Sequence, residues 1–136
     1  MDKITIETIV NAPIDKVWNY WTAPEHIANW AYASDDWEAH EPTNDLKAGG
    51  AFKTTMRAKD LSEGFDFKGV YSVVEEPELI EYSLEDGRQV RTEFTPVPDG
   101  VQILQSFDPE KESELDYQKQ GWMAILNNFK DYTERS

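Results

Sequence analysis

The sequence has no cysteine and only two histidines among its 136 residues. The absence of cysteine excludes a disulfide scaffold, a cysteine nucleophile and thiolate ligands for a metal. A zinc site needs three or four converging nitrogen, sulfur or oxygen ligands. His26 falls in a predicted short helix and His40 just before a predicted loop. We therefore expect two ordinary surface or corner histidines, with no bound metal and no cofactor.

Basic residues are also scarce. The chain carries 13 lysines and arginines against 27 aspartates and glutamates, which gives a formal net charge of −14. A surface of that sign repels nucleic-acid phosphates and anionic lipid headgroups. We therefore expect neither nucleic acid nor a membrane as a partner, and we interpret the acidity as a contribution to solubility.

Long apolar runs are missing as well. No stretch approaches the roughly 18 consecutive apolar residues that a membrane span requires. Residues 1–3 lead directly into an alternating strand pattern, with no sign of a secretory signal. These features predict a cytoplasmic protein, and the length predicts one domain that covers residues 1–136.

Motifs for nucleophilic or phosphate chemistry are absent from the sequence. It contains no Gly-x-Ser-x-Gly elbow. The pair Gly49-Gly50 is not followed by the Lys-Ser/Thr helix start of a phosphate loop, so we interpret it as a tight entry into a strand. Asp35-Asp36 is expected beside the opening of any hollow in the fold. We interpret it as a solvated turn, with gating or cation binding as the alternative.

Tryptophan, by contrast, is abundant. Four of the five tryptophans, Trp18, Trp21, Trp30 and Trp37, fall in the first third of the chain, and Trp122 falls near the end. Large aromatic side chains need a thick core or a deep hollow in which to pack. The composition therefore favours a fold with a substantial aromatic interior.

The last stretch, residues 113–135, predicts one long amphipathic helix. Ser113 followed by Asp116 resembles a capping box. Gly121 inside a helix costs about 1 kcal/mol relative to alanine, so we expect another backbone or a ligand close beside Trp122. The apolar stripe has spacings of three and four and contains Leu115, Gln118, Trp122, Ile125, Leu126, Phe129 and Tyr132.

The rest of the chain alternates in the manner of strands, apart from two short helices. A strand over 3–10 precedes helices that begin near Pro13 and at the capping-box pattern of residues 22–25. Further strands are expected at 37–41, 51–58, 65–73, 79–84, 90–94 and 101–107. Asp86-Gly87 and Asp99-Gly100 predict hairpin turns. The fold class is therefore α+β. A curved antiparallel sheet of six to seven strands wraps around the C-terminal helix, with two short helices after the first strand.

Several local strings occur in an order typical of one superfamily. They are Ala12-Pro13, Val17-Trp18, residues 22–30 and 44–47, Gly49-Gly50, Phe52, residues 64–67, Gly69, Tyr71, residues 86–88, 107–110 and 120–122, and Ile125-Leu126. This set resembles the START-like superfamily, also called SRPBCC or helix-grip. Within it, the set is similar to the AHSA1-like group of small bacterial proteins, named after the activator of Hsp90 ATPase. The resemblance implies a hollow between sheet and helix that takes hydrophobic small molecules in many relatives. Because binders, carriers, cyclases and a co-chaperone domain share this scaffold, the resemblance fixes no single activity.

The inward phases of the predicted strands and helices nominate the residues that line this hollow. They are Trp18, Phe52, Met56, Phe67, Tyr71, Tyr82, Phe94, Gln105, Trp122, Ile125 and Phe129. We expect the protein to bind a small hydrophobic or aromatic molecule there without catalysis, and we assign no catalytic residue.

Two alternatives stay open. A cyclase or aromatase of the polyketide type would aim polar groups into the same hollow, and the inward candidates are Tyr71, Tyr82, Thr54, Thr92 and Gln105. A chaperone-interacting module would resemble the Hsp90 activator. Arg57, Arg91 and Glu93 fall on the outward phase, where we expect surface ion pairs.

Overall fold

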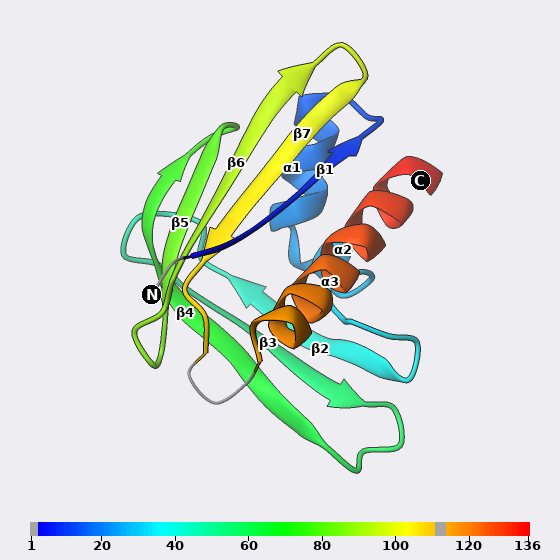
Figure 1. Ribbon diagram of the computed structural model, residues 1–136, viewed down its shortest axis with the longest axis vertical. Helices are drawn as coiled ribbons and strands as arrows, with labels where there is room; N and C mark the ends of the chain where they lie inside the picture. Colours follow the sequence, from blue (N-terminus) through cyan, green and yellow to red (C-terminus); the bar gives the residue numbers. More distant parts are fainter. Residues whose placement is uncertain (1–2, 111–113) are drawn as a thin grey trace.

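A computed structural model describes residues 3–110 and 114–136, and its backbone is a curled antiparallel sheet with one long helix in its concave side (Figure 1). The strands are β1 (Ile4–Val10), β2 (Trp37–Asn44), β3 (Ala51–Ala58), β4 (Gly64–Glu75), β5 (Leu79–Leu84), β6 (Gln89–Val97) and β7 (Gly100–Phe107). The helices are α1 (Ile14–Thr22), α2 (Pro24–Ile27) and α3 (Leu115–Arg135). The predicted α+β class and antiparallel architecture are therefore confirmed.

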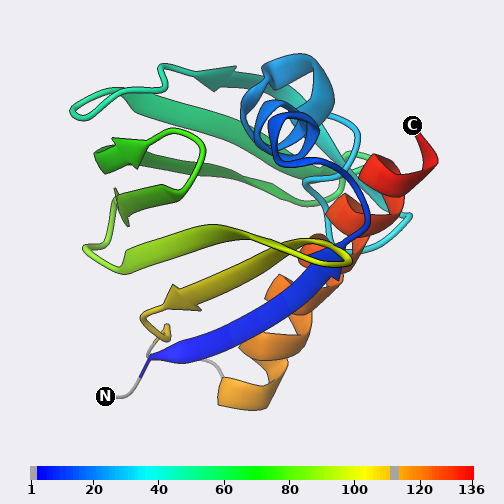
Figure 2. The ribbon, with the colours of Figure 1, turned by 90° about the horizontal axis from the view of Figure 1, so that it is seen from above.

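The strand order explains how the sheet forms a half-barrel. The strands pair antiparallel in the order β1-β7-β6-β5-β4-β3-β2, so the first two strands of the chain form opposite edges. Sheets of this size twist and curl. Seen from above, the two ends of the sheet fold toward the same side, where α3 lies along β1 (Figure 2). The helices α1 and α2 connect the two edges, and α2 contacts β2.

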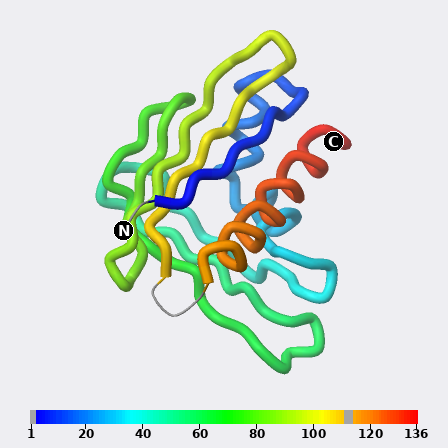
Figure 3. The backbone as a smooth tube through the Cα atoms, viewed as in Figure 1, coloured from blue at the N-terminus to red at the C-terminus, as the bar shows by residue number. Residues whose placement is uncertain are grey.

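The core lies between the inner face of the sheet and α3. In β7, residues Val101, Ile103 and Phe107 alternate with partly exposed neighbours and are at most 1% exposed. Leu126 and Phe129 of α3 are equally buried. The tube representation shows the helix running obliquely across this face (Figure 3). Burying these side chains stabilises the fold by about 1.5–3 kcal/mol for each large apolar residue.

The predicted turns and strands agree with the structure apart from their ends. Gly87 and Gly100 both have positive φ, as the hairpin turns require. Strand β2 extends to Asn44, three residues further than predicted, and its register with β3 shifts near Glu41, which has a φ of 45°. A bulge shifts the two-residue alternation beyond it, so the regular pattern that predicts the strand ends there.

The predicted helix caps differ from those observed. The Thr22 hydroxyl donates to the carbonyl of Trp18 at 2.8 Å, so it closes α1 and does not cap α2. Ala23 is the N-cap of α2, and no described side chain caps that helix. The predicted capping residue Ser113 lies outside the described residues. The N-cap of α3 is Glu114, and none of the described side chains caps it. Leu115, which was predicted to join the buried stripe, is 52% exposed. Within the described parts of the chain, no helix is long and apolar enough to cross a membrane.

The expected close approach of another backbone at Gly121 is not found among the described residues. A Cβ atom added at this glycine would meet no described atom within 4 Å outside its own helix. The helical propensity cost of Gly121 is therefore not offset by a contact that only glycine permits.

We expect Gly121→Ala to raise the free energy of unfolding by about 0.5–1 kcal/mol, because alanine fits the open space and favours the helix. Denaturant-induced unfolding would measure the change. Gly69→Ala provides the contrast, since its Cβ would collide with the backbone oxygen of Ser83 and press on the Phe52 ring at 3.0 Å. A lower stability for Gly121→Ala would show that this position is not open.

Candidate functional site

A cavity of about 270 Å³ lies between the inner face of the sheet and α3. Its volume is near the lower end for small-molecule sites, which begin at about 300 Å³. Eight of the eleven predicted residues line it: Phe52, Met56, Phe67, Tyr71, Tyr82, Gln105, Trp122 and Ile125. They come from five elements that are distant in sequence, namely β3, β4, β5, β7 and α3.

Three predicted lining residues, Trp18, Phe94 and Phe129, lie elsewhere. Trp21 lines the cavity and packs edge-to-face on Phe94 and Phe129, with ring centroids 5.6 and 4.8 Å apart. These two phenylalanines therefore form the core behind the cavity wall. Trp18 packs on Phe94 at 5.5 Å and donates its indole N–H to Glu76 Oε1 at 3.0 Å. Trp18, Phe94 and Phe129 are therefore not among the residues that line this cavity, whereas Trp21, which contacts both phenylalanines, lines it.

Several lining residues were not predicted. They are Trp21, Ile27, Trp30, Ala31, Phe65, Ile80, Arg88, Glu110 and Leu126, and the polar candidate Thr54 lines the cavity as well. The three- and four-residue spacing of apolar residues in the short helices is a signal that could have found Trp21, Ile27 and Trp30. Arg88 and Glu110 adjoin strand ends, where periodicity gives no signal. The remaining polar candidate, Thr92, is fully buried behind the lining.

Aromatic rings form most of the cavity wall. Phe52 contacts Tyr71 and Tyr82, with ring centroids 5.2 and 4.7 Å apart. Trp122 stacks on Phe107 at 4.0 Å with an interplanar angle of 15°, and its edge meets Phe67 at 5.9 Å. Ring pairs at these distances hold each other in fixed orientations. The wall is therefore preformed and suited to an apolar or aromatic guest.

A few polar groups converge inside this apolar wall. The Tyr71 hydroxyl donates to Asn44 Oδ1 at 2.6 Å, so it is engaged within the protein. Gln105 donates through Nε2 to Thr92 Oγ1 at 3.1 Å. Among the described residues, neither the Tyr82 hydroxyl nor Gln105 Oε1 has a hydrogen-bond partner, although both residues are more than nine-tenths buried. These two groups are available to a ligand.

Burial also sets the protonation state of the two tyrosines. Removal from water raises the pKa of Tyr71 well above its ordinary value. The pKa of Tyr82 rises for the same reason, and the neighbouring Tyr71 adds to the effect while Arg88 opposes it. Both hydroxyls are therefore neutral at physiological pH and can act as hydrogen-bond donors.

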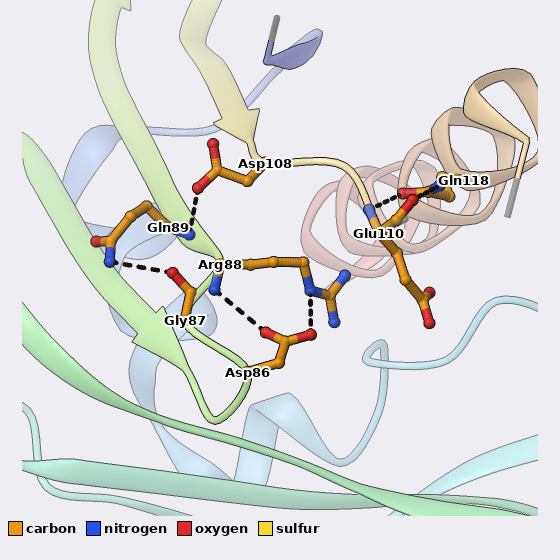
Figure 4. A network of polar contacts seen from close by, with 7 residues as sticks. All are labelled: Asp86, Gly87, Arg88, Gln89, Asp108, Glu110 and Gln118. Carbon is orange, nitrogen blue, oxygen red and sulfur yellow. Dashed lines mark hydrogen bonds and ion pairs between the residues drawn. The ribbon is translucent and has the colours of Figure 1, made fainter. Parts of the chain in front are cut away.

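Charged residues occur at one side of the cavity (Figure 4). Arg88 follows the β5–β6 turn and donates through Nε to Asp86 Oδ2 at 2.7 Å. Glu110 exchanges two backbone hydrogen bonds with the Gln118 amide, at 2.6 and 2.8 Å. Burial raises the pKa of Asp86, but hydrogen bonds from the backbone and side chain of Arg88 outweigh that effect and lower it overall.

The outward arginines lie on the opposite face of the sheet, as predicted. Arg91 pairs with Glu81 and Glu93 at 2.7 and 2.8 Å, and Arg57 pairs with Glu38 at 2.6 Å. None of these residues lines the cavity. They form surface ion pairs of small energetic value.

The two histidines, the acidic turn and the glycine pair singled out in the sequence make contacts with neighbouring parts of the protein. His26 is hydrogen-bonded to the Tyr132 hydroxyl at 2.7 Å and stacks on Tyr20, whereas His40 lies 3.6 Å from Glu41. Within the described parts of the chain, no three potential metal ligands gather. The Asp36 carboxylate accepts from Ser34 at 2.6 Å in a local turn. At Gly49-Gly50 the chain turns tightly into β3, because Gly49 has a φ of +86° and a Cβ at Gly50 would collide with Asp45.

Comparison with known proteins shows which family and which solved structures share this architecture. The family model described as Activator of Hsp90 ATPase homolog 1-like protein matches residues 11–134. A solution structure of an AHSA1-like protein from Aeromonas hydrophila is 41% identical with a TM-score of 0.93, and a solution structure of a protein from Cytophaga hutchinsonii is 53% identical with a TM-score of 0.84. Each alignment covers 98% of this chain and 92% of the other. A crystal structure from Nitrosomonas europaea, 16% identical with a TM-score of 0.86 and coverage of 98% and 95%, shares the fold. A search of curated proteins found no match.

We expect the native protein to lose stability as the pH rises above about 10. A group whose pKa is raised by folding stabilises the native state below its unfolded pKa, here 10.0, and that contribution is lost at higher pH. Tyr71 and Tyr82 should therefore ionise only on unfolding. A phenolate absorbance titration of the wild type and of Tyr71→Phe/Tyr82→Phe should agree while both are folded, and should differ by two tyrosines after unfolding. A difference of that size in the native state would contradict the assignment.

Proposed function

This chain belongs to the family of Activator of Hsp90 ATPase homolog 1-like proteins, and from that premise we propose that it binds a small hydrophobic or aromatic molecule in the cavity between the sheet and α3. The observation that carries the proposal is the preformed cavity of about 270 Å³ with an aromatic wall and few polar groups. Burial of apolar ligand surface supplies affinity in such a site, and the polar groups fix orientation.

The polar groups favour binding over catalysis. General acid–base catalysis works best with a group whose pKa lies near the working pH. The raised pKa values of Tyr71 and Tyr82 move both hydroxyls away from that range. In this proposal Tyr82 orients the ligand by donating a hydrogen bond, and the ligand leaves chemically unchanged. No observation on the described residues favours a chaperone interface over this cavity.

We expect a neutral apolar fluorophore such as N-phenylnaphthylamine to bind in the cavity, to gain fluorescence and to raise the melting temperature. Ligand at 100 times its dissociation constant would add about 2.7 kcal/mol to the free energy of unfolding. Fluorescence titration and thermal denaturation would measure these effects. A panel of apolar compounds that leaves the melting temperature unchanged would remove the support for this function.

The variant Met56→Trp should weaken this binding at least about tenfold, because the larger side chain occupies ligand space at the cavity wall. Val70→Trp is the matched control, since Val70 is 48% exposed and does not line the cavity. Titration of both variants with the same fluorophore makes the comparison. Equal affinities for the two variants would place the ligand outside the cavity.

A further inference from the structure

The charge of the cavity lining differs from that of the whole chain. Although the net charge is −14, the described lining residues include one cationic side chain, Arg88, and one anionic side chain, Glu110. The Arg88 side chain is only 25% exposed, whereas the outward Arg91 is 47% exposed. A cation withdrawn from water beside an apolar cavity is costly unless its donors find acceptors. It therefore matters which acceptors the N–H donors of Arg88 use.

Asp86 fixes the position of Arg88 but accepts from only some of the hydrogen-bond donors of Arg88. The carboxylate accepts from the backbone N–H of Arg88 at 3.2 Å and from Nε at 2.7 Å. Guanidinium has five N–H donors in a rigid fork. Asp86 is the ion-pair partner of the side chain, but among the described residues the two terminal nitrogens donate no hydrogen bond. Figure 4 shows the guanidinium extending from the turn toward Glu110 and the start of α3.

Glu110 does not neutralise these donors. The structure has no ion pair between Arg88 and Glu110, although both line the cavity. The Gln118 amide holds the backbone of Glu110 from both sides, so this segment is anchored independently of Arg88. The terminal nitrogens of Arg88 are therefore left facing a site that a ligand can reach.

A second donor lies in the same cavity. The Tyr82 hydroxyl has no partner among the described residues, and it is neutral at physiological pH. Arg88 and Tyr82 both line this cavity, and the positive charge of Arg88 lowers the pKa of Tyr82 slightly against the effect of burial. A carboxylate has two oxygens and four lone-pair sites, so it can accept from the guanidinium fork and from a hydroxyl together.

We propose that the ligand of this cavity is amphipathic: its carboxylate pairs with the terminal nitrogens of Arg88, and its apolar body lies against the rings of Phe52, Phe67 and Trp122. This inference rests on the proposed binding function and specifies the ligand class. Asp86 is a positioning residue, because it orients the fork without contacting the ligand. Charge-assisted bonds of the arginine–carboxylate type are short and about twice as strong as neutral ones.

Three probes with the same ten-carbon tail test the proposal: decanoate, decanol and decylammonium. We expect the wild type to bind decanoate about tenfold more tightly than decanol, which corresponds to ~1.4 kcal/mol, and to bind decylammonium most weakly. Competition with the neutral fluorophore would measure all three affinities. A preference for decylammonium would overturn the proposal and assign the charged contact to Glu110.

The variant Arg88→Gln should lose the preference for decanoate while retaining its affinity for decanol, which also reports that the cavity is intact. Arg91→Gln is the matched control, because it removes the same charge from the outer face of the sheet. It should retain the preference. If Arg88→Gln still prefers decanoate, or if both variants lose the preference equally, the contact with Arg88 is refuted. Binding of decanol without any preference for decanoate would refute the carboxylate and leave the proposed function standing, whereas failure of every probe would remove both.

Discussion

The packing of α3 against the concave face of the sheet determines the rest of this structure. Leu126 and Phe129 are almost completely buried, and they anchor the second half of the helix in the core. Toward the start of the helix, Trp122 stacks on Phe107 and Ile125 faces the cavity. The curled sheet is wider than one helix can fill. A space between them therefore remains where the aromatic rings of β3, β4 and β5 pack on one another.

The free-energy cost of burying polar groups explains which of them are paired within the protein at this cavity. A buried polar group without a partner costs free energy, so most are paired within the protein. Tyr71 follows this rule through Asn44, and Thr92 follows it through Gln105. Tyr82 and Arg88 retain donor capacity at the cavity. In the proposed function, these two residues are where a ligand would supply the missing acceptors.

The family relationship and the site rest on different kinds of information. The match over residues 11–134 and the two solution structures establish the family, and distant relatives at 16% identity retain the same backbone. Backbone similarity at that distance conveys architecture and no particular ligand. In the proposed function the ligand class depends on side chains such as Arg88, which neither the fold nor the family name specifies.

The sequence by itself determined the element order, the antiparallel class and most of the aromatic lining, because alternation and helical periodicity report which face of each element avoids water. It could not decide which buried aromatics face the cavity and which lie behind it. Phe94 in its strand and Phe129 in its helix fall on the inward phase just as Phe52 does, and only packing makes them partners of Trp21 and not part of the cavity lining. The charged side of the cavity likewise required the tertiary structure, since Arg88 and Glu110 come from segments without periodicity and line one cavity only when the sheet closes on α3.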